Sequence, residues 1–180
     1  TMAMPAGTIL YSTAQTAVFP TDWKTKLSTA SSSSLTSSTI TGIKFEKTVP
    51  SGYTTKVGTI TGAGKSIDVY RSTSKSTDIA FVSSITIEPA SCSNLFSSLS
   101  ALTTISFNNF DTKYITSTFN MFRLSSKITT ITFGDGFDTS NVTSMMQMFH
   151  TCSSLKSLDL SQLKSDKLTD IFGMFVMCSN

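Results

Sequence analysis

The only histidine of the 180-residue chain, His150, stands two residues before Cys152 in the stretch "MFHTCSSL". A histidine next to a cysteine can activate the thiol as a nucleophile. Cys152 also belongs to a regularly spaced set of apolar residues, so we expect its side chain to point into the core, and no third residue is placed to orient the histidine. We therefore interpret His150 as an exposed residue at the end of a helix, and predict neither enzymatic activity nor a cofactor.

The sequence offers few residues that could bind a metal ion. A zinc site needs three or four His or Cys ligands, and the chain has one histidine and three cysteines. The stretch "GDGFD" (134–138) brings two carboxylates together, Asp135 and Asp138. Calcium requires ~6–8 oxygen ligands, however, and no glutamate follows. We therefore predict no metal site and interpret this stretch as a turn that closes a strand.

Cys152 and Cys178 occupy equivalent positions of successive repeats, 26 residues apart. Neighbouring strands would bring their Cα atoms within the ~4.4–6.8 Å that a disulfide allows, so a bridge is one alternative. The other is a row of buried free thiols that pack as small apolar groups. Ser125 fills the same position one repeat earlier. Because positional equivalence alone explains both cysteines, we favour free thiols.

Composition narrows the class of protein. Hydrophobic residues make up 39% of the chain, which indicates an ordered core, and 32 Ser and 30 Thr supply most of the polar surface. The net charge is +3 without a dense basic stripe, which argues against nucleic acid as a partner. No apolar run approaches the ~20 residues of a membrane-spanning helix. The first residues lack the pattern of a signal peptide, so an export signal would have to lie outside this segment.

The sequence repeats itself with a period of 26 or 27 residues. Three stretches share the pattern apolar-x-x-apolar-x-apolar, namely "LTTISF" (102–107), "ITTITF" (128–133) and "LKSLDL" (155–160). Repeats of this length are typical of leucine-rich-repeat proteins. Pairs of Met and Phe keep the same period: Met121-Phe122, Met148-Phe149 and Met174-Phe175.

Each repeat has two halves with different hydrophobic periods. The first half alternates, which is typical of a short strand with one buried face. In the second half, apolar residues at i, i+3, i+7 and i+10 predict a stripe on a short helix: Val142, Met145, Phe149 and Cys152. Thr139 and Ser140 are expected to cap that helix. Stacked copies would form a parallel sheet. We therefore predict an α/β fold, a right-handed leucine-rich-repeat solenoid with one short strand and one short helix per repeat.

The stretch from Phe137 to Ser161, "FDTSNVTSMMQMFHTCSSLKSLDLS", resembles the repeat of BspA-like leucine-rich-repeat surface proteins of bacteria. The resemblance covers about residues 102–180 and extends less closely to "IEPASCSNLF" (87–96). It implies a secreted or wall-attached, non-catalytic, adhesin-like protein, but it supplies no ligand. The last repeat departs from the pattern, because "LKSDKLTD" (163–170) replaces the usual aspartate–threonine–serine–asparagine turn.

Residues 1–84 lack a clear repeat and contain short β segments: "GTILYS", "TITGIKFEKT", "KVGTITG", "SIDVYRS" and "DIAFVSSITIE", the last extending to residue 88. Between them, Asp22 to Leu27 could form one helical turn or an irregular loop. We predict that 1–84 form a β-rich cap over the open end of the first repeat, with an independent binding module as the alternative. Residues 85–180 would form three to four repeats, and the lack of a capping sequence predicts that the array continues beyond Asn180.

The polar residues that alternate with the buried positions are expected to line the open face of the sheet. Repeat proteins bind partners through such extended surfaces. This face lacks aromatic anchors, so we predict weak, multivalent, adhesin-like binding to a protein or glycan on host or neighbouring cells. A passive stalk that displays another domain is the alternative function. The predicted ligand-facing residues are Thr104, Ser106, Asn108, Thr130, Thr132, Ser157, Asp159 and Ser161.

Overall fold

The computed structural model describes residues 15–178 and places two β-sheets and one helix in them. The elements are β1 (Thr16–Phe19), α1 (Trp23–Ala30), β2 (Gly42–Glu46), β3 (Thr55–Ile60), β4 (Ile67–Arg71), β5 (Asp78–Val82), β6 (Thr86–Pro89), β7 (Thr104–Phe107) and β8 (Thr130–Thr132).

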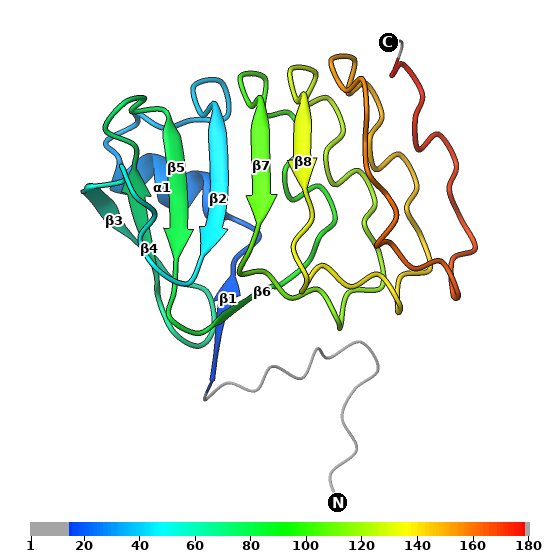
Figure 1. Ribbon diagram of the computed structural model, residues 1–180, viewed down its shortest axis with the longest axis horizontal. Coiled ribbons are helices and arrows are strands. Elements are labelled where there is room, and N and C mark those ends of the chain that lie inside the picture. Colours follow the sequence, from blue (N-terminus) through cyan, green and yellow to red (C-terminus); the bar gives the residue numbers. More distant parts are fainter. Residues whose placement is uncertain (1–14, 179–180) are drawn as a thin grey trace, which may run out of the picture.

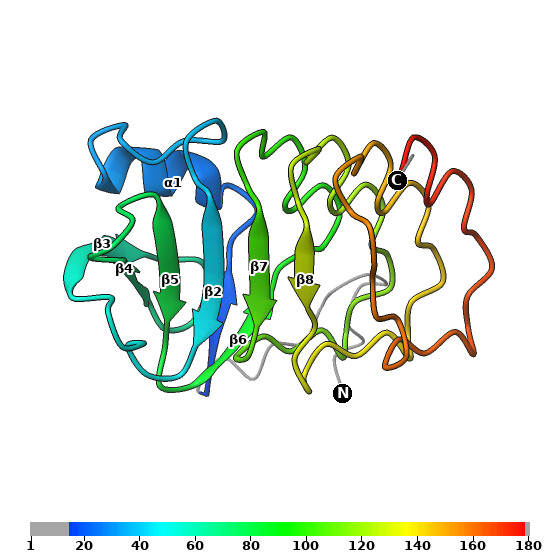
Figure 2. The ribbon, with the colours of Figure 1, turned by 45° about the horizontal axis from the view of Figure 1, so that its top comes forward.

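The larger sheet has six strands in the order β3-β4-β5-β2-β7-β8 (Figure 1). Strands β3, β4 and β5 pair antiparallel, whereas β5, β2, β7 and β8 run parallel. A second sheet pairs β1 with β6 in parallel. In Figure 2, α1 lies along one side of the six-stranded sheet, near the ends of β5 and β2. The result is a mixed sheet that continues from the N-terminal half of the chain into the repeats.

Alternation of side chains explains the register of the parallel strands. Ile43 and Phe45 of β2 are buried and lie opposite Ile79 and Phe81 of β5. On the other side of β2, Ile105 and Phe107 of β7 occupy the same rows. Because successive residues of a strand point to opposite faces, one face of the sheet carries this apolar set and the other carries the residues between them. We call the second face the outer face.

Two columns of phenylalanine rings form the centre of the core. The first follows the sheet, with Phe45 stacked on Phe107 at 5.5 Å and 6° between ring planes, and Phe107 on Phe133 at 6.2 Å. The second follows the later half of each repeat, with Phe122 stacked on Phe149 at 5.6 Å and 2°. Such offset contacts add to the free energy gained from burying the rings. The periodic sequence therefore builds a periodic aromatic core.

Helix α1 closes the core at its N-terminal end. Trp23 and Leu27 are fully buried, and the indole Nε1 of Trp23 donates a hydrogen bond to the carbonyl oxygen of Leu95 at 2.8 Å. A buried indole N–H needs such a partner.

Two serines after the helix, Ser32 and Ser33, have positive φ angles of 52° and 64°. Of the two alternatives for this segment, a helix is the one that forms, and it is longer than one turn.

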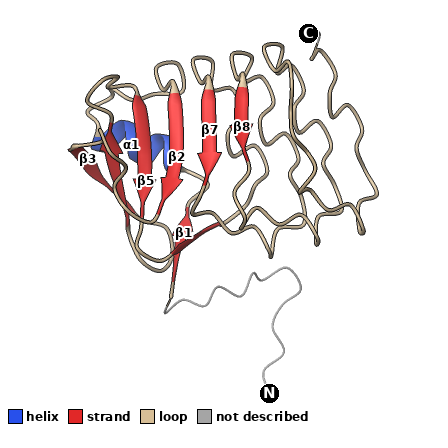
Figure 3. Cartoon of the chain, viewed as in Figure 1, coloured by secondary structure: helices blue, strands red, loops and turns tan. Residues whose placement is uncertain are grey.

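The predicted α/β leucine-rich-repeat solenoid is wrong. The structure is mostly β-sheet, with a mixed six-stranded sheet, and the single helix of residues 15–178 lies outside the repeats. Figure 3 shows the later half of every repeat in the tan of loops and turns. The apolar stripe from Val142 to Cys152 is buried at all four positions, but it belongs to turns. Thr139 and Ser140 consequently cap no helix.

Left-handed backbone conformations prevent a helix in these segments. Each repeat has two residues with φ between 54° and 65°, four positions apart. An α-helix requires φ near −60° throughout, and a residue with a side chain disfavours the left-handed region. The residues recur with the period of the sequence: Asn94, Asn120, Gln147 and Gly173 in one set, and Ser98, Leu124, Thr151 and Met177 in the other.

Hydrogen bonds between repeats take the place of helical ones. The amide N–H of Asn120 donates to the carbonyl oxygen of Met146 at 3.1 Å, and that of Phe122 donates to Met148 at 2.9 Å. One repeat later, the N–H of Phe149 donates to Met174 at 3.0 Å. The partners lie about one period apart rather than four residues apart. The backbone N–H groups of these segments therefore find their acceptors in the adjacent repeat, so their hydrogen bonds are satisfied without a helix.

The expected strand at Leu155–Leu160 is also absent, since this stretch has no regular secondary structure. Leu155 is buried, but Leu158 and Leu160 are only half-buried. In residues 1–84, four of the expected β segments contain β2, β3, β4 and β5 to within one residue, and the last of them also reaches β6. "GTILYS" lies outside the described residues. The division at residue 84 stays a prediction, and the same sheet and the same apolar cluster extend across it.

Candidate binding surface

The outer face of β7 and β8 carries four of the predicted ligand-facing residues. Thr104 lies opposite Thr130, and Ser106 lies opposite Thr132. Thr104, Thr130 and Thr132 are exposed, and Ser106 is half-buried. Paired residues of neighbouring strands have side chains only ~5 Å apart. The two strands therefore present two short rows of hydroxyl groups to solvent.

The remaining predicted residues extend these rows unequally. Asn108 follows β7 and is exposed, but its side-chain amide donates to Oε1 of Glu46 at 2.8 Å. Ser157, Asp159 and Ser161 are exposed on the next repeat, which forms no strand there. Oδ1 of Asp159 accepts a hydrogen bond from the backbone N–H of Ser161 at 2.9 Å. Bonding by Ser161, from its side chain and its backbone, lowers the pKa of Asp159.

Strand β2 adds charged residues to this face that the sequence argument missed. Lys44 lies opposite Ser106, and Gly42 lies opposite Thr104. The Nζ of Lys44 stands over the ring of Tyr53 at 5.5 Å from its centroid. Lys44 lies 62 residues before its partner Ser106 and, like Glu46, outside the repeats, so the period could not reveal either residue. The alternation in "GIKFE", with Ile43 and Phe45 buried, is the signal that could have placed them on the outer face.

The side chains of His150 and Cys152 hydrogen-bond to different partners. The Sγ of Cys152 is buried and donates a hydrogen bond to the carbonyl oxygen of Phe122 at 3.2 Å. Burial raises the pKa of this thiol to about 12, which suppresses the thiolate that a nucleophile needs. Nδ1 of His150 pairs with the Thr151 hydroxyl at 2.7 Å. The cysteines of residues 15–178, Cys92, Cys152 and Cys178, are all free thiols.

The "GDGFD" stretch is a turn. Oδ1 of Asp138 accepts a hydrogen bond from the backbone N–H of Ser140 at 2.8 Å, and hydrogen bonding from Ser140 lowers the pKa of Asp138. Asp135 is exposed. A Cβ at Gly134 would stand 1.9 Å from the carbonyl oxygen of Phe107, so only glycine fits there. No group of three or more His, Cys, Asp or Glu side chains in residues 15–178 is arranged to hold a metal ion.

The outer face of β2, β7 and β8 is therefore a surface of hydroxyls with one lysine and one carboxylate. Hydroxyl groups donate and accept hydrogen bonds and impose no strict geometry on a partner. Large exposed rings, which dominate the affinity of most tight interfaces, do not occur among the predicted ligand-facing residues. Such a surface suits contacts that are individually weak. Within the part of the chain that the structure covers, no helix is long and apolar enough to cross a membrane.

Comparison with known proteins identifies a family without identifying an activity. Residues 90–180 match the model of a family described as "Mycoplasma protein of unknown function, DUF285". No curated protein and no solved structure matches the chain. The matched segment is just over half of the 180 residues and contains β7, β8 and the later repeats. The chain therefore belongs to the DUF285 family of proteins of unknown function.

Proposed function

We propose that this protein is a non-enzymatic, adhesin-like binding protein at the surface of a bacterium or outside it. Its partner would be a protein or glycan on a host or neighbouring cell. The observation that carries the proposal is the pair of hydroxyl rows on the outer face, Thr104 with Thr130 and Ser106 with Thr132. The resemblance of the repeats to BspA-like surface proteins supports the same function and location.

The chemistry of the face sets the mode of binding. Hydrogen bonds from exposed hydroxyls replace hydrogen bonds to water, so each contributes only about 0.5–1.5 kcal/mol. Two rows of short side chains cannot supply a high affinity on these terms. Several copies presented together gain avidity without new contacts, because the second binding event becomes intramolecular. The proposed protein thus acts through many weak contacts with an extended partner.

A passive spacer is the second candidate, and the stacked phenylalanine column favours it. Phe122, Phe149 and Phe175 stack at 5.6 and 5.5 Å with nearly parallel rings. The repeats along this column are also joined by backbone hydrogen bonds. A structure so regular would hold another domain at a fixed distance. In that case the outer face would contact nothing.

Array binding distinguishes the two candidates. The chain would be coupled to a tetrameric carrier and applied to glycan and protein arrays, with the monomer alongside. We expect reproducible binding by the tetramer and little by the monomer. A double variant with Thr130→Glu and Thr132→Glu should lose the signal. The matched control, Thr116→Glu with Ser165→Glu, adds the same charges at exposed residues outside the sheet and should retain it.

Two outcomes would contradict the binding proposal. A folded tetramer that binds nothing on either array would favour the spacer. Equal loss of signal in both double variants would show that added negative charge, rather than the outer face, determines binding. Circular dichroism and a thermal melt of each variant are needed to show that it is folded.

A further inference from the structure

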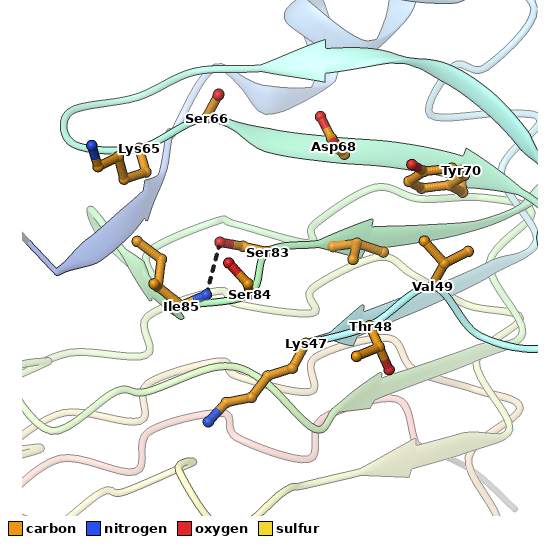
Figure 4. A pocket seen from close by; sticks show the side chains of 11 residues that line it. Lys47, Thr48, Val49, Lys65, Ser66, Asp68, Tyr70, Ser83, Ser84 and Ile85 are labelled. Carbon is orange, nitrogen blue, oxygen red and sulfur yellow. Dashed lines mark hydrogen bonds between the residues drawn. The ribbon is translucent and has the colours of Figure 1, made fainter.

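A cavity of about 600 Å³ opens on the outer face of the six-stranded sheet, at the end distant from β8. The segment after β2 forms one wall, and the start of β4 with the turn before it forms the other (Figure 4). The floor comes from the end of β5 and the residues that lead into β6. This volume lies within the range of ~300–1,000 Å³ that small-molecule sites occupy.

The lining is apolar at one end and rich in hydroxyls along its length. Val49 and the ring of Tyr70 lie together at one end in Figure 4. Val82 also lines the cavity and belongs to the apolar cluster against which Tyr70 packs. Ser66, Ser83 and Ser84 line the cavity. In Figure 4 Ser83 and Ser84 lie beside Ile85, whereas the Ser66 hydroxyl is turned to the same side as the Asp68 carboxylate. The hydroxyl of Ser83 accepts a hydrogen bond from the backbone N–H of Ile85 at 3.4 Å and keeps its own hydrogen to donate. A ligand would therefore meet an aromatic and aliphatic surface beside several hydroxyls.

Two lysines give the other end of the cavity a positive charge. Lys47 and Lys65 are exposed, and Figure 4 shows them on opposite walls of the cavity, on either side of Ile85, with their side chains extending away from each other. Neither ammonium group has an ion pair or hydrogen-bond partner among residues 15–178. Charges on the walls of a concave site attract an oppositely charged ligand. Two unpaired ammonium groups at one end indicate that this ligand is an anion.

The one carboxylate of the lining does not cancel these charges. Oδ1 of Asp68 forms an ion pair with Nζ of Lys56 at 2.9 Å and accepts a hydrogen bond from the Thr59 hydroxyl at 3.0 Å. In Figure 4 its carboxylate is turned toward β3, away from Ser83 and Lys47. The charge of Asp68 is thus already balanced by Lys56, which lies outside the cavity. Lys47 and Lys65 therefore give the cavity a net positive charge.

We propose that this cavity binds an acidic sugar, a pyranose ring that carries a carboxylate. The C–H face of the ring would pack against Tyr70 and Val49, and its hydroxyls would bond to the serines. The carboxylate would lie near Ile85, where the charges of Lys47 and Lys65 attract it from the two walls. Neutral sugars would lack the charge contact, and simple aliphatic or aromatic acids would leave the serines without partners. This site is separate from the hydroxyl rows of β7 and β8, so neither proposal depends on the other.

Titration with glucuronate tests the assignment, with glucose as the uncharged analogue. Amide resonances of the intact, isotope-labelled chain would be followed by nuclear magnetic resonance. We expect saturable shifts at Tyr70 and at Val82 to Ile85, and an affinity for glucose at least tenfold lower. Exposed ion pairs are weak, so each of Lys47→Gln and Lys65→Gln should reduce the affinity about three- to fivefold. Added salt should weaken the binding of glucuronate and leave that of glucose unchanged.

A double variant with Lys127→Gln and Lys156→Gln is the matched control, because both residues are exposed lysines outside the cavity. It should bind glucuronate as the unaltered chain does. Equal weakening in this control, equal binding of glucose and glucuronate, or no saturable shift would overturn the proposal. Tighter binding of an acetylated glutamate dipeptide than of glucuronate would also overturn it, and would assign the cavity to an acidic peptide.

Discussion

The thiol of Cys152 donates a hydrogen bond to the carbonyl oxygen of Phe122, thirty residues earlier in the chain, at 3.2 Å. Cys178 makes the same bond to Phe149 at 2.9 Å, and the Ser125 hydroxyl makes it to Phe96 at 2.7 Å. Three successive repeats therefore use one position to satisfy a carbonyl group of the preceding repeat. The requirement is a small side chain with a donor, which serine and cysteine both meet.

The first prediction concerns this position. Cys152→Ser keeps a donor and should change the free energy of unfolding by less than about 1 kcal/mol, because Ser125 already fills the role. Cys152→Val removes one of the two hydrogen bonds to the Phe122 carbonyl oxygen, which keeps the backbone N–H of Ser125 at 3.1 Å. In a site where residue 152 is 0% exposed, this should cost about 0.5–1.5 kcal/mol, more than the serine variant. Urea unfolding of the three proteins measures both values. A valine variant as stable as the serine variant would contradict the role of the hydrogen bond.

The second prediction concerns the phenylalanine column. Phe149 is stacked between Phe122 and Phe175 and is fully buried. Phe149→Ala should lower the free energy of unfolding by about 3–5 kcal/mol, since it removes a large buried side chain and leaves a cavity. Phe175 is 48% exposed at the end of the column, so Phe175→Ala should cost less than half as much. Equal losses in chemical denaturation would contradict the assigned burial.

The third prediction concerns a clamp between repeats. The Thr139 hydroxyl donates to the carbonyl oxygen of Lys164 at 2.8 Å and accepts from its backbone N–H at 2.7 Å. Thr112 makes the first of these bonds one repeat earlier, to Asp138 at 2.7 Å. Thr139 is 1% exposed. Thr139→Val keeps the shape of the side chain but leaves the N–H and the carbonyl oxygen of Lys164 without this hydrogen-bond partner. It should lower the free energy of unfolding by about 2 kcal/mol or more.

The control for this clamp is Thr139→Ser, which keeps the hydroxyl and loses one methyl group. It should cost about 1 kcal/mol. Hydrogen exchange of the Lys164 amide provides an independent measurement, because the valine variant should expose that amide selectively. Unchanged protection in the valine variant would show that the amide has another partner.

The fourth prediction concerns the pH dependence of stability. Glu88 is 3% exposed, and one of its oxygens, Oε2, has no hydrogen-bond partner. Desolvation raises its pKa, and this outweighs the opposing effect of Lys113, whose Nζ lies 3.5 Å from Oε1. The folded state therefore favours the protonated acid. Its contribution to stability is complete below the unfolded pKa of about 4.3 and is lost as the pH rises through the higher folded value.

Glu88→Gln removes this titration, so its stability relative to the unaltered chain should improve as the pH rises from about 4 to 7. The difference between the two proteins isolates Glu88 from Asp138 and Asp159, whose lowered pKa values change stability in the opposite direction. Thermal melts across this pH range provide the measurement. A difference that stays constant or shrinks with rising pH would contradict the raised pKa.

Local patterns in the sequence were sufficient to predict which apolar residues of the repeats are buried. Leu102, Ile128 and Leu155 are all buried, as are Val142, Met145, Phe149 and Cys152. Hydrophobic period alone predicts such positions, because an apolar side chain gains free energy wherever the backbone allows it to leave water. The segments that coincide with β2 to β5 were recognised as short β segments separated by turn residues. Seven of the eight predicted ligand-facing residues are exposed and Ser106 is half-buried, while their role in binding stays a prediction.

The same patterns could not distinguish a helix from a turn in the later half of each repeat. Apolar spacing of three and four residues fits both, since either backbone returns a side chain to the same side after three or four positions. The left-handed conformations of Asn120 and Gln147 are disfavoured for an isolated segment. They persist because the neighbouring repeat supplies hydrogen-bond partners about 26 residues away.

The sequence alone was therefore sufficient to predict which residues are buried and the period at which buried residues recur. The path of the backbone between them was not, because it depends on where each N–H finds its acceptor. Met146, Met148 and Met174 provide acceptors only after the chain has returned beside itself. Likewise Lys47, Lys65 and Tyr70 are brought around one cavity by pairing of β2, β4 and β5, a relationship between distant segments that no local pattern records.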